Sequence, residues 1–234
     1  GISNWRLDAS KMNRTIFLAR PDPDEKDLIK TACSICDSYQ SQASRTFRPI
    51  LEALAKAYYR IQCENFKSEY SDFHGARDFY SLIKQVSSKL VQRDANKQVE
   101  DIVIEAVERN FGGIPGSIKR FKEILTQESM VYAERVNVSL PVIDLVGANL
   151  QDPTSRYLMI VSNSNYGTYI LEHFFARHSS RSQILVGSNF DEDLSKEEYS
   201  FKTLSNIIIH MEKGDSIIMQ NLDSIYPSLY DLFN

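Results

Sequence analysis

In the first half of the chain, up to about residue 130, apolar residues recur every three or four positions. This is the spacing of an α-helix that buries one face. Glycine and proline residues at 75 and 112–116 interrupt the pattern and separate successive helices. The first half therefore predicts a compact helical bundle. Its clearest apolar stripes are Ile50, Leu51, Leu54, Tyr58 and Ile61; Phe79, Leu82, Ile83 and Val86; and Val99, Ile102, Val103, Ala106 and Val107.

The first predicted helix has a defined start and carries two cysteines. Asp22 can cap it, Pro23 suits the first helical position, and Glu25 lies three residues after the cap. Cys33 and Cys36 have the spacing of half a zinc site or of a redox pair, but no second pair of ligands follows at zinc-like spacing. Both cysteines share a helix face with apolar residues, which favours buried free thiols in a reducing cytosol.

The pattern changes near residue 151, where short apolar runs begin to alternate with helical periodicity. Short continuous apolar runs are typical of buried parallel strands. The order strand, helix, strand, helix, strand is that of the front of a doubly wound α/β sheet. The fold class is thus α/β with a large helical part. The expected strands are Tyr157–Val161, Ile184–Val186 and Ile217–Met219, and the expected helices between them are Tyr169–Arg177 and Tyr199–Met211.

Composition restricts the function without identifying it. Of the 234 residues, 42% are hydrophobic and 25% charged, which excludes a disordered chain. The formal net charge of -4 argues against a general nucleic-acid binder, which needs a basic surface. The sequence has no stretch of about 18 apolar residues that predicts a transmembrane segment, and its start lacks the pattern of a secretory signal. These features predict a cytosolic globular protein without metal.

Three polar residues of the first half fit the second half of a P-loop ATPase. Asn4 lies at the end of an expected opening strand and could orient the water that attacks a γ-phosphate, as a sensor 1 residue does, or it could form a turn. Arg14 is a candidate arginine finger for a neighbouring nucleotide; a surface salt bridge is the alternative, and Arg20 competes for the role. Arg77 at a helix start is a sensor 2 candidate, or the partner of an acidic neighbour.

In the second half, the expected phosphate loop is degenerate. The segment after the first predicted strand keeps Ser162, Asn163, Gly167 and Thr168 but lacks the lysine and most glycines of a working loop. A working metal-site strand normally ends in adjacent acidic residues. The corresponding strand here ends in Gln-Asn-Leu-Asp, so that Asn221 and Asp223 reproduce those acids poorly. This half is interpreted as a module that kept the fold and lost the catalysis.

Several unusual motifs resemble the mysterin family, giant RING-type E3 ubiquitin ligases with tandem AAA+ modules. They extend over nearly the whole chain, and the connecting segment is the least similar part. The motifs are Gly1–Trp5, Leu7-Asp8, Lys11–Arg14, Gly75, Arg77–Lys84, Arg109–Phe111, Arg156–Leu158, Met211-Glu212, Asn221-Leu222 and Ser228–Asp231.

The resemblance implies that residues 1–135 are the end and helical lid of one AAA+ module, expected to be the fourth. Residues 136–155 would be a connector, and residues 156–234 the first half of a degenerate fifth module. ATP and Mg²⁺ are implied for the parent protein but not as tight ligands of this segment. The implied partners are neighbouring modules of the same chain and, through distant domains, the ubiquitin machinery.

By this interpretation the segment contributes sensor and finger residues to an ATPase motor but is catalytically silent alone. Two alternatives stay open. The segment could be a structural interaction module without nucleotide chemistry, or it could belong to another giant AAA+ protein of the dynein or midasin type.

Overall fold

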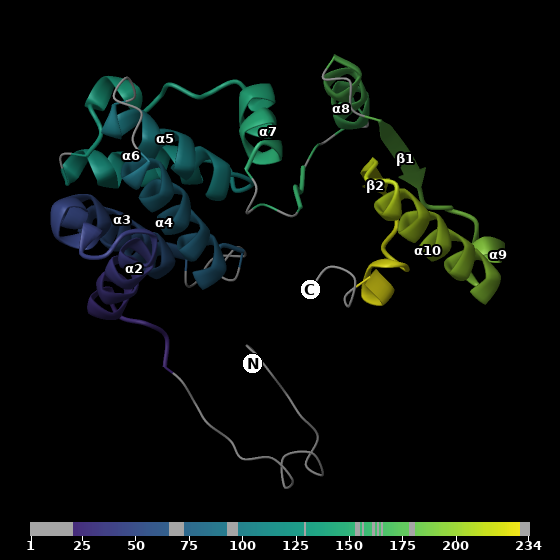
Figure 1. Cartoon of the computed structure of the whole chain (residues 1–234), viewed down its shortest axis with the longest axis horizontal. Helices are drawn as coiled ribbons and strands as arrows, with labels where there is room; N and C mark the ends of the chain where they lie inside the picture. Colours follow the sequence, from purple (N-terminus) through teal and green to yellow (C-terminus); the bar gives the residue numbers. More distant parts are fainter. Residues whose placement is uncertain are drawn as a thin grey trace, which may run out of the picture. The chain divides into compact units, whose positions relative to one another are not determined.

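The structure, a computed structural model, falls into two compact units that divide between residues 153 and 154 (Figure 1). No helix among the residues it describes is long and apolar enough to cross a membrane. The described residues are 21–65, 73–92, 98–128, 130–152, 155, 157–160, 162, 164, 166–177 and 181–229.

The first unit is a bundle of helices, as the apolar stripes predict. In it α2 packs against α3 and α4, α4 packs against α5, α3 packs against α6, and α5 packs against α7. The described elements are α2 (Glu25–Tyr39), α3 (Ala43–Asn65), α4 (Ala76–Val91), α5 (Val99–Asn110), α6 (Ser117–Gln127), the 3₁₀ turn η1 (Ala133–Arg135) and α7 (Val142–Leu150).

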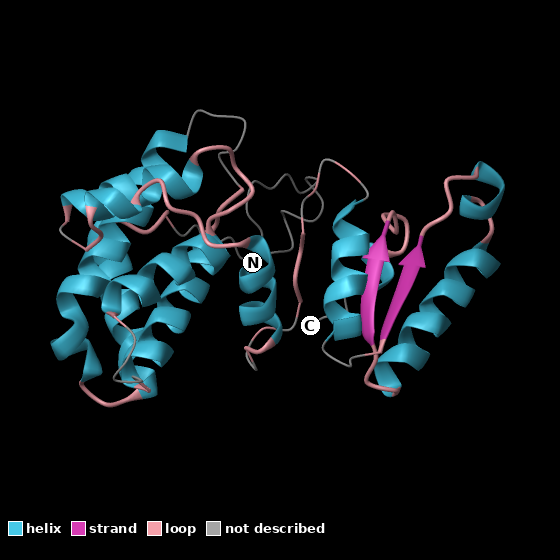
Figure 2. Cartoon of the chain, turned by 90° about the horizontal axis from the view of Figure 1, so that it is seen from above, coloured by secondary structure: helices cyan, strands magenta, loops and turns pink. Residues whose placement is uncertain are grey.

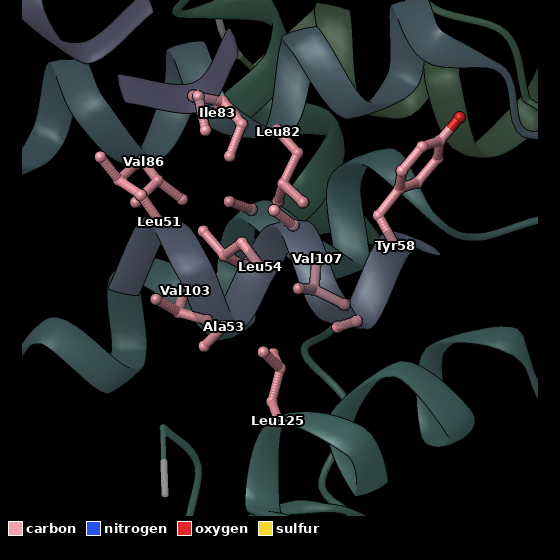
Figure 3. Packing of buried hydrophobic residues seen from close by; sticks show 14 of the residues in the cluster. Leu51, Ala53, Leu54, Tyr58, Leu82, Ile83, Val86, Val103, Val107 and Leu125 are labelled. Carbon is pink, nitrogen blue, oxygen red and sulfur yellow. The ribbon is translucent and has the colours of Figure 1, made fainter. Parts of the chain in front are cut away.

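The core of this bundle is built from the three predicted stripes. Leu51, Leu54, Leu82 and Val107 are completely buried, and Figure 3 shows their side chains converging between the helices. Aromatic rings continue the core toward the α5–α6 turn, where the ring centroid of Phe111 lies 4.7 Å from that of Phe121 and 6.0 Å from that of Tyr58. The helical periodicity is therefore confirmed, because each stripe meets another and is removed from water.

Helix α2 begins later than the sequence predicts. Its N-cap is Asp24 and not Asp22, and the Asp24 carboxylate accepts a hydrogen bond of 2.8 Å from the backbone N–H of Asp27. This bond satisfies one of the free N–H groups of the first turn, so the carboxylate nearest that turn determines the start. Cys36 is buried in the core and Cys33 is half-buried, both as free thiols.

The second unit has a small parallel sheet. Strands β1 (Ser182–Val186) and β2 (Ser216–Gln220) pair along their full length, with Ser182 opposite Ser216 and Val186 opposite Gln220. In Figure 2 the two strands run side by side between helices, and Figure 1 identifies these helices as α8 and α10. The remaining elements are α8 (Tyr166–Arg177), α9 (Asp191–Leu194), α10 (Glu197–Glu212) and the 3₁₀ turn η2 (Tyr226–Leu229).

The first expected strand of the second half is wrong. Residues 157–160 form no strand and pair with neither β1 nor β2; Met159 is 78% exposed. A strand forms only against a partner, and the two described strands pair with each other. Helix α7 lies within residues 136–155, the predicted connector, to which the sequence assigned no secondary structure. It contains Gly147 and β-branched residues of low helix propensity, but Val146 is buried, so packing stabilises it.

Candidate functional site

The first turn of α8 is joined to the end of β2 by a side-chain hydrogen bond. The Thr168 hydroxyl donates to the side-chain carbonyl oxygen of Gln220 over 3.1 Å. Thr168 is the third residue of α8, and Gln220 is the last residue of β2. Thr168, a predicted phosphate-loop residue, therefore meets the residue directly before Asn221, which was predicted for the metal-site strand.

The carboxyl ends of the two strands approach each other closely. The backbone N–H of Gly187, directly after β1, donates to the backbone oxygen of Gln220 over 2.8 Å. A Cβ atom built on Gly187 would lie 1.6 Å from the backbone oxygen of Asn221, so only glycine fits. Asn221 itself has a φ of 53°, a left-handed conformation that asparagine tolerates better than most residues.

The acidic candidate of this edge, Asp223, makes no described contact with Thr168 or Gln220. Asp223 is exposed in a turn, and Leu222 before it is buried with Ile225 and Leu229 in the small core of the second unit. In the part of the chain that the structure describes, no group of three or more His, Cys, Asp and Glu side chains is placed to hold a metal ion. The residues that meet at this edge are thus a hydroxyl and a neutral amide.

The remaining phosphate-loop candidates make local contacts. The Ser162 hydroxyl donates to the backbone oxygen of Ser164 over 2.8 Å and accepts from its N–H over 3.3 Å. Gly167 lies in the first turn of α8, and a Cβ there would come 3.4 Å from that of Ser162. Asn163 lies outside the described residues. Mg²⁺ with a triphosphate calls for a carboxylate and a lysine beside the loop hydroxyl. The pair of Thr168 and the Gln220 amide supplies neither, so this pair does not fit that ligand.

Arg77 lies in the first turn of α4, on an anchored helix start. The Asp78 carboxylate accepts a hydrogen bond of 2.8 Å from the backbone N–H of Gly75. The residue before Gly75 is the buried His74, whose Nε2 lies 2.9 Å from the backbone oxygen of Gly112. This contact joins the start of α4 to the turn between α5 and α6. The Arg77 side chain is exposed and has no ion pair with another described residue. The guanidinium of Arg77 is therefore exposed at a helix start that hydrogen bonds hold in place.

The other candidates of the first half, Asn4, Arg14 and its competitor Arg20, lie outside the described residues. Sequence reasoning missed Gln220, although it directly precedes Asn221 at the end of the apolar run. It also missed the buried ion pair between Glu108 and Lys122, whose spacing of 14 residues matches no local pattern.

Comparison with known proteins gives matches at both ends and over the whole length. Residues 147–234 match a family model described as an RNF213 AAA domain, and residues 1–27 match a second model of that description. The whole chain aligns at 35% identity with E3 ubiquitin-protein ligase rnf213-beta of Danio rerio and at 32% with E3 ubiquitin-protein ligase RNF213 of Homo sapiens. It spans only 5% and 4% of these relatives. The chain therefore belongs to the RNF213 (mysterin) family and carries sequence of that family's AAA domains.

Proposed function

We propose that this chain is part of the AAA+ ATPase motor of a mysterin-like E3 ubiquitin-protein ligase. In this proposal residues 1–135 close an active fourth module, residues 136–155 connect, and residues 156–234 open an inactive fifth module. The matches of the two ends to two different AAA models support this order. Ubiquitin transfer belongs to other parts of the parent, which acts in the cytosol.

The contact between Thr168 and Gln220 carries the proposal for the inactive module. In P-loop ATPases a Ser or Thr hydroxyl of the loop and an acidic residue of the neighbouring strand hold Mg²⁺ together. Here the hydroxyl donates its proton to a neutral amide, at the end of a strand where a working module presents a carboxylate. Neutral side chains at both positions favour a module that does not hydrolyse ATP.

The first unit would serve the nucleotide of its own module or of a neighbour. Asn4 would orient the attacking water, Arg14 would act as the arginine finger, and Arg77 would contact a phosphate. The exposure of Arg77 on an anchored helix start supports its role, because a phosphate contact needs a free and well-positioned guanidinium. ATP and Mg²⁺ would be bound with upstream parts of the parent.

Calorimetry on the 234-residue chain tests the inactive module. We expect no heat of binding when Mg²⁺ and ATP are added at micromolar concentrations. A saturable signal in that range would reveal a complete nucleotide pocket and overturn the proposal.

ATP turnover of the parent protein tests the residue roles. Arg77→Ala and Arg14→Ala should each slow turnover by tenfold or more, since phosphate-contacting arginines typically contribute at least this much, about 10³-fold for a finger. Arg45→Ala is a matched control, because Arg45 is also exposed on a bundle helix. Unchanged turnover in both variants would leave the alternative, a structural interaction module without nucleotide chemistry.

A further inference from the structure

Helix α5 contacts the segment of residues 130–152, here called the strap, at its start, middle and end. The strap begins after α6 and contains η1 and α7. Charged side chains at both ends of α5 reach successive points of it. The contacts are Glu100 Oε1 with the N–H of Tyr132 at 2.7 Å, Asp101 Oδ1 with Arg135 Nη2 at 2.9 Å, Glu108 Oε2 with the N–H of Leu140 at 2.7 Å, and Arg109 Nη2 with Asp152 Oδ2 at 3.1 Å.

The third contact involves a buried ion pair. Glu108 Oε1 accepts a hydrogen bond from the ammonium of Lys122 on α6, and the side chains are 0% and 1% exposed. Removing two charges from water costs free energy, which their attraction recovers only when further hydrogen bonds satisfy both groups. The helices alone do not supply these bonds.

The strap supplies both of them. Its Leu140 N–H donates to the second Glu108 oxygen, and its Val138 backbone oxygen accepts from the Lys122 ammonium over 2.6 Å. If the strap left the bundle, a buried carboxylate and a buried ammonium would each lose a partner. The bundle therefore favours the docked strap.

Apolar contacts and a further ion pair secure the two ends. Val131 belongs to the bundle core, and Val146 of α7 is buried where α7 packs against α5. Beyond α7, Asp152 pairs with Arg109, whose side chain is only 4% exposed. Anchors thus occur at the start, middle and end of the strap.

We propose that the strap is a conformational coupling device that moves with the helical bundle as one body. A displacement of the bundle is then transmitted through the strap as far as Asp152. The network around Glu108 and Lys122 is the central fastening. This inference concerns the chain itself and does not depend on ATP binding.

Hydrogen exchange of the 234-residue chain tests it directly. The amides of Tyr132 and Leu140 should exchange at least about a hundredfold more slowly than in an unstructured peptide, and together with amides of α5 such as that of Val107. The proposal would be overturned if the amides of Tyr132 and Leu140 exchanged as fast as in an unstructured peptide while the amides of α5 stayed protected.

A double variant tests the central fastening. Replacing both partners of a buried pair by apolar residues generally preserves folding, so Glu108→Leu with Lys122→Met should keep the bundle intact. Exchange at Leu140 should rise at least tenfold while Val107 stays protected. The control replaces the acid by Leu and the base by Met in the exposed pair of α3 and α6, as Glu64→Leu with Arg120→Met. Equal exchange at Leu140 in wild type and in the first variant would show that the pair does not fasten the strap.

Discussion

The hydroxyl of Thr168 donates a hydrogen bond of 3.1 Å to the side-chain oxygen of Gln220, and this contact links the start of α8 to the end of β2. Both side chains are part of the fold of the second unit. Their contribution to its stability is measurable independently of any nucleotide.

A double-mutant cycle should detect the contact. Thr168→Val and Gln220→Ala should each lower the free energy of unfolding of the second unit by about 0.5–1.5 kcal/mol, the usual range for one hydrogen bond. The double variant should lose less than the sum, because the second substitution removes a bond that is already absent. Urea unfolding measures all four proteins. Strict additivity would mean that the contact contributes nothing.

Gly187→Ala should strongly destabilise the second unit. Its new methyl group would lie 1.6 Å from the backbone oxygen of Asn221, so the ends of β1 and β2 would have to separate. We expect a loss of at least about 2 kcal/mol in urea unfolding. Gly112→Ala is the control, because the nearest atom to its added methyl group lies at an ordinary 3.7 Å. Similar stabilities for the two variants would contradict the close approach.

The three cysteines should differ in reactivity. Burial raises the pKa of the Cys36 thiol and that of Cys33, which lowers the fraction of reactive thiolate near neutral pH. Cys63 is exposed. In native protein we therefore expect iodoacetamide to label Cys63 first and Cys36 only after unfolding, as peptide mass mapping would show. Early labelling of Cys36 would contradict its place in the core.

Stability should depend on Glu64 in a defined pH range. A hydrogen bond from Arg120 lowers the pKa of the Glu64 carboxyl below its ordinary 4.5. The folded state thus binds the proton more weakly than the unfolded state, so this contribution is complete above about pH 4.5 and disappears as the pH falls through the lowered pKa. Because the pair is about half-exposed, Glu64→Gln should cost only about 0.2–1 kcal/mol at pH 7.

Urea unfolding of wild type and Glu64→Gln at pH 7 and at pH 3 measures this difference, which should shrink at the lower pH. Glu134→Gln is the control, since Glu134 is exposed and has no ion pair within the described part of the chain. A constant difference at both pH values would rule out the ion pair as its cause.

The regular elements were largely predictable because their signals are local. A stripe such as Phe79, Leu82, Ile83 and Val86 reports both the helix and its buried face. The short apolar runs at β1 and β2 report the strands but not their burial, because Ile218 is the one buried residue of the two strands. Residues 157–160 carry a similar apolar run but form no strand, because strand formation also requires an available neighbour. A helix forms its backbone hydrogen bonds within its own segment, whereas a strand needs a neighbouring segment to supply its backbone hydrogen bonds.

The candidate site was predictable only in part. The meeting of the phosphate-loop position with the end of the metal-site strand follows from the expected order of strands and helices, and Thr168 takes part in it. That its partner is Gln220 depends on the register of β2 and on the first turn of α8. The roles of Asn4, Arg14 and Arg77 stay predictions, and the first two lie outside the described residues.

The sequence by itself determined the helical bundle, the two paired strands and the membership of the mysterin family, because hydrophobic periodicity and motifs are properties of neighbouring residues in the sequence. Tertiary structure alone decided that Glu108 and Lys122 pair in the interior and that the strap completes their hydrogen bonds. Their partners come from α5, α6 and the strap, and no local pattern relates these segments. Burial brings them together, and a buried charge without its partners would cost too much free energy to persist.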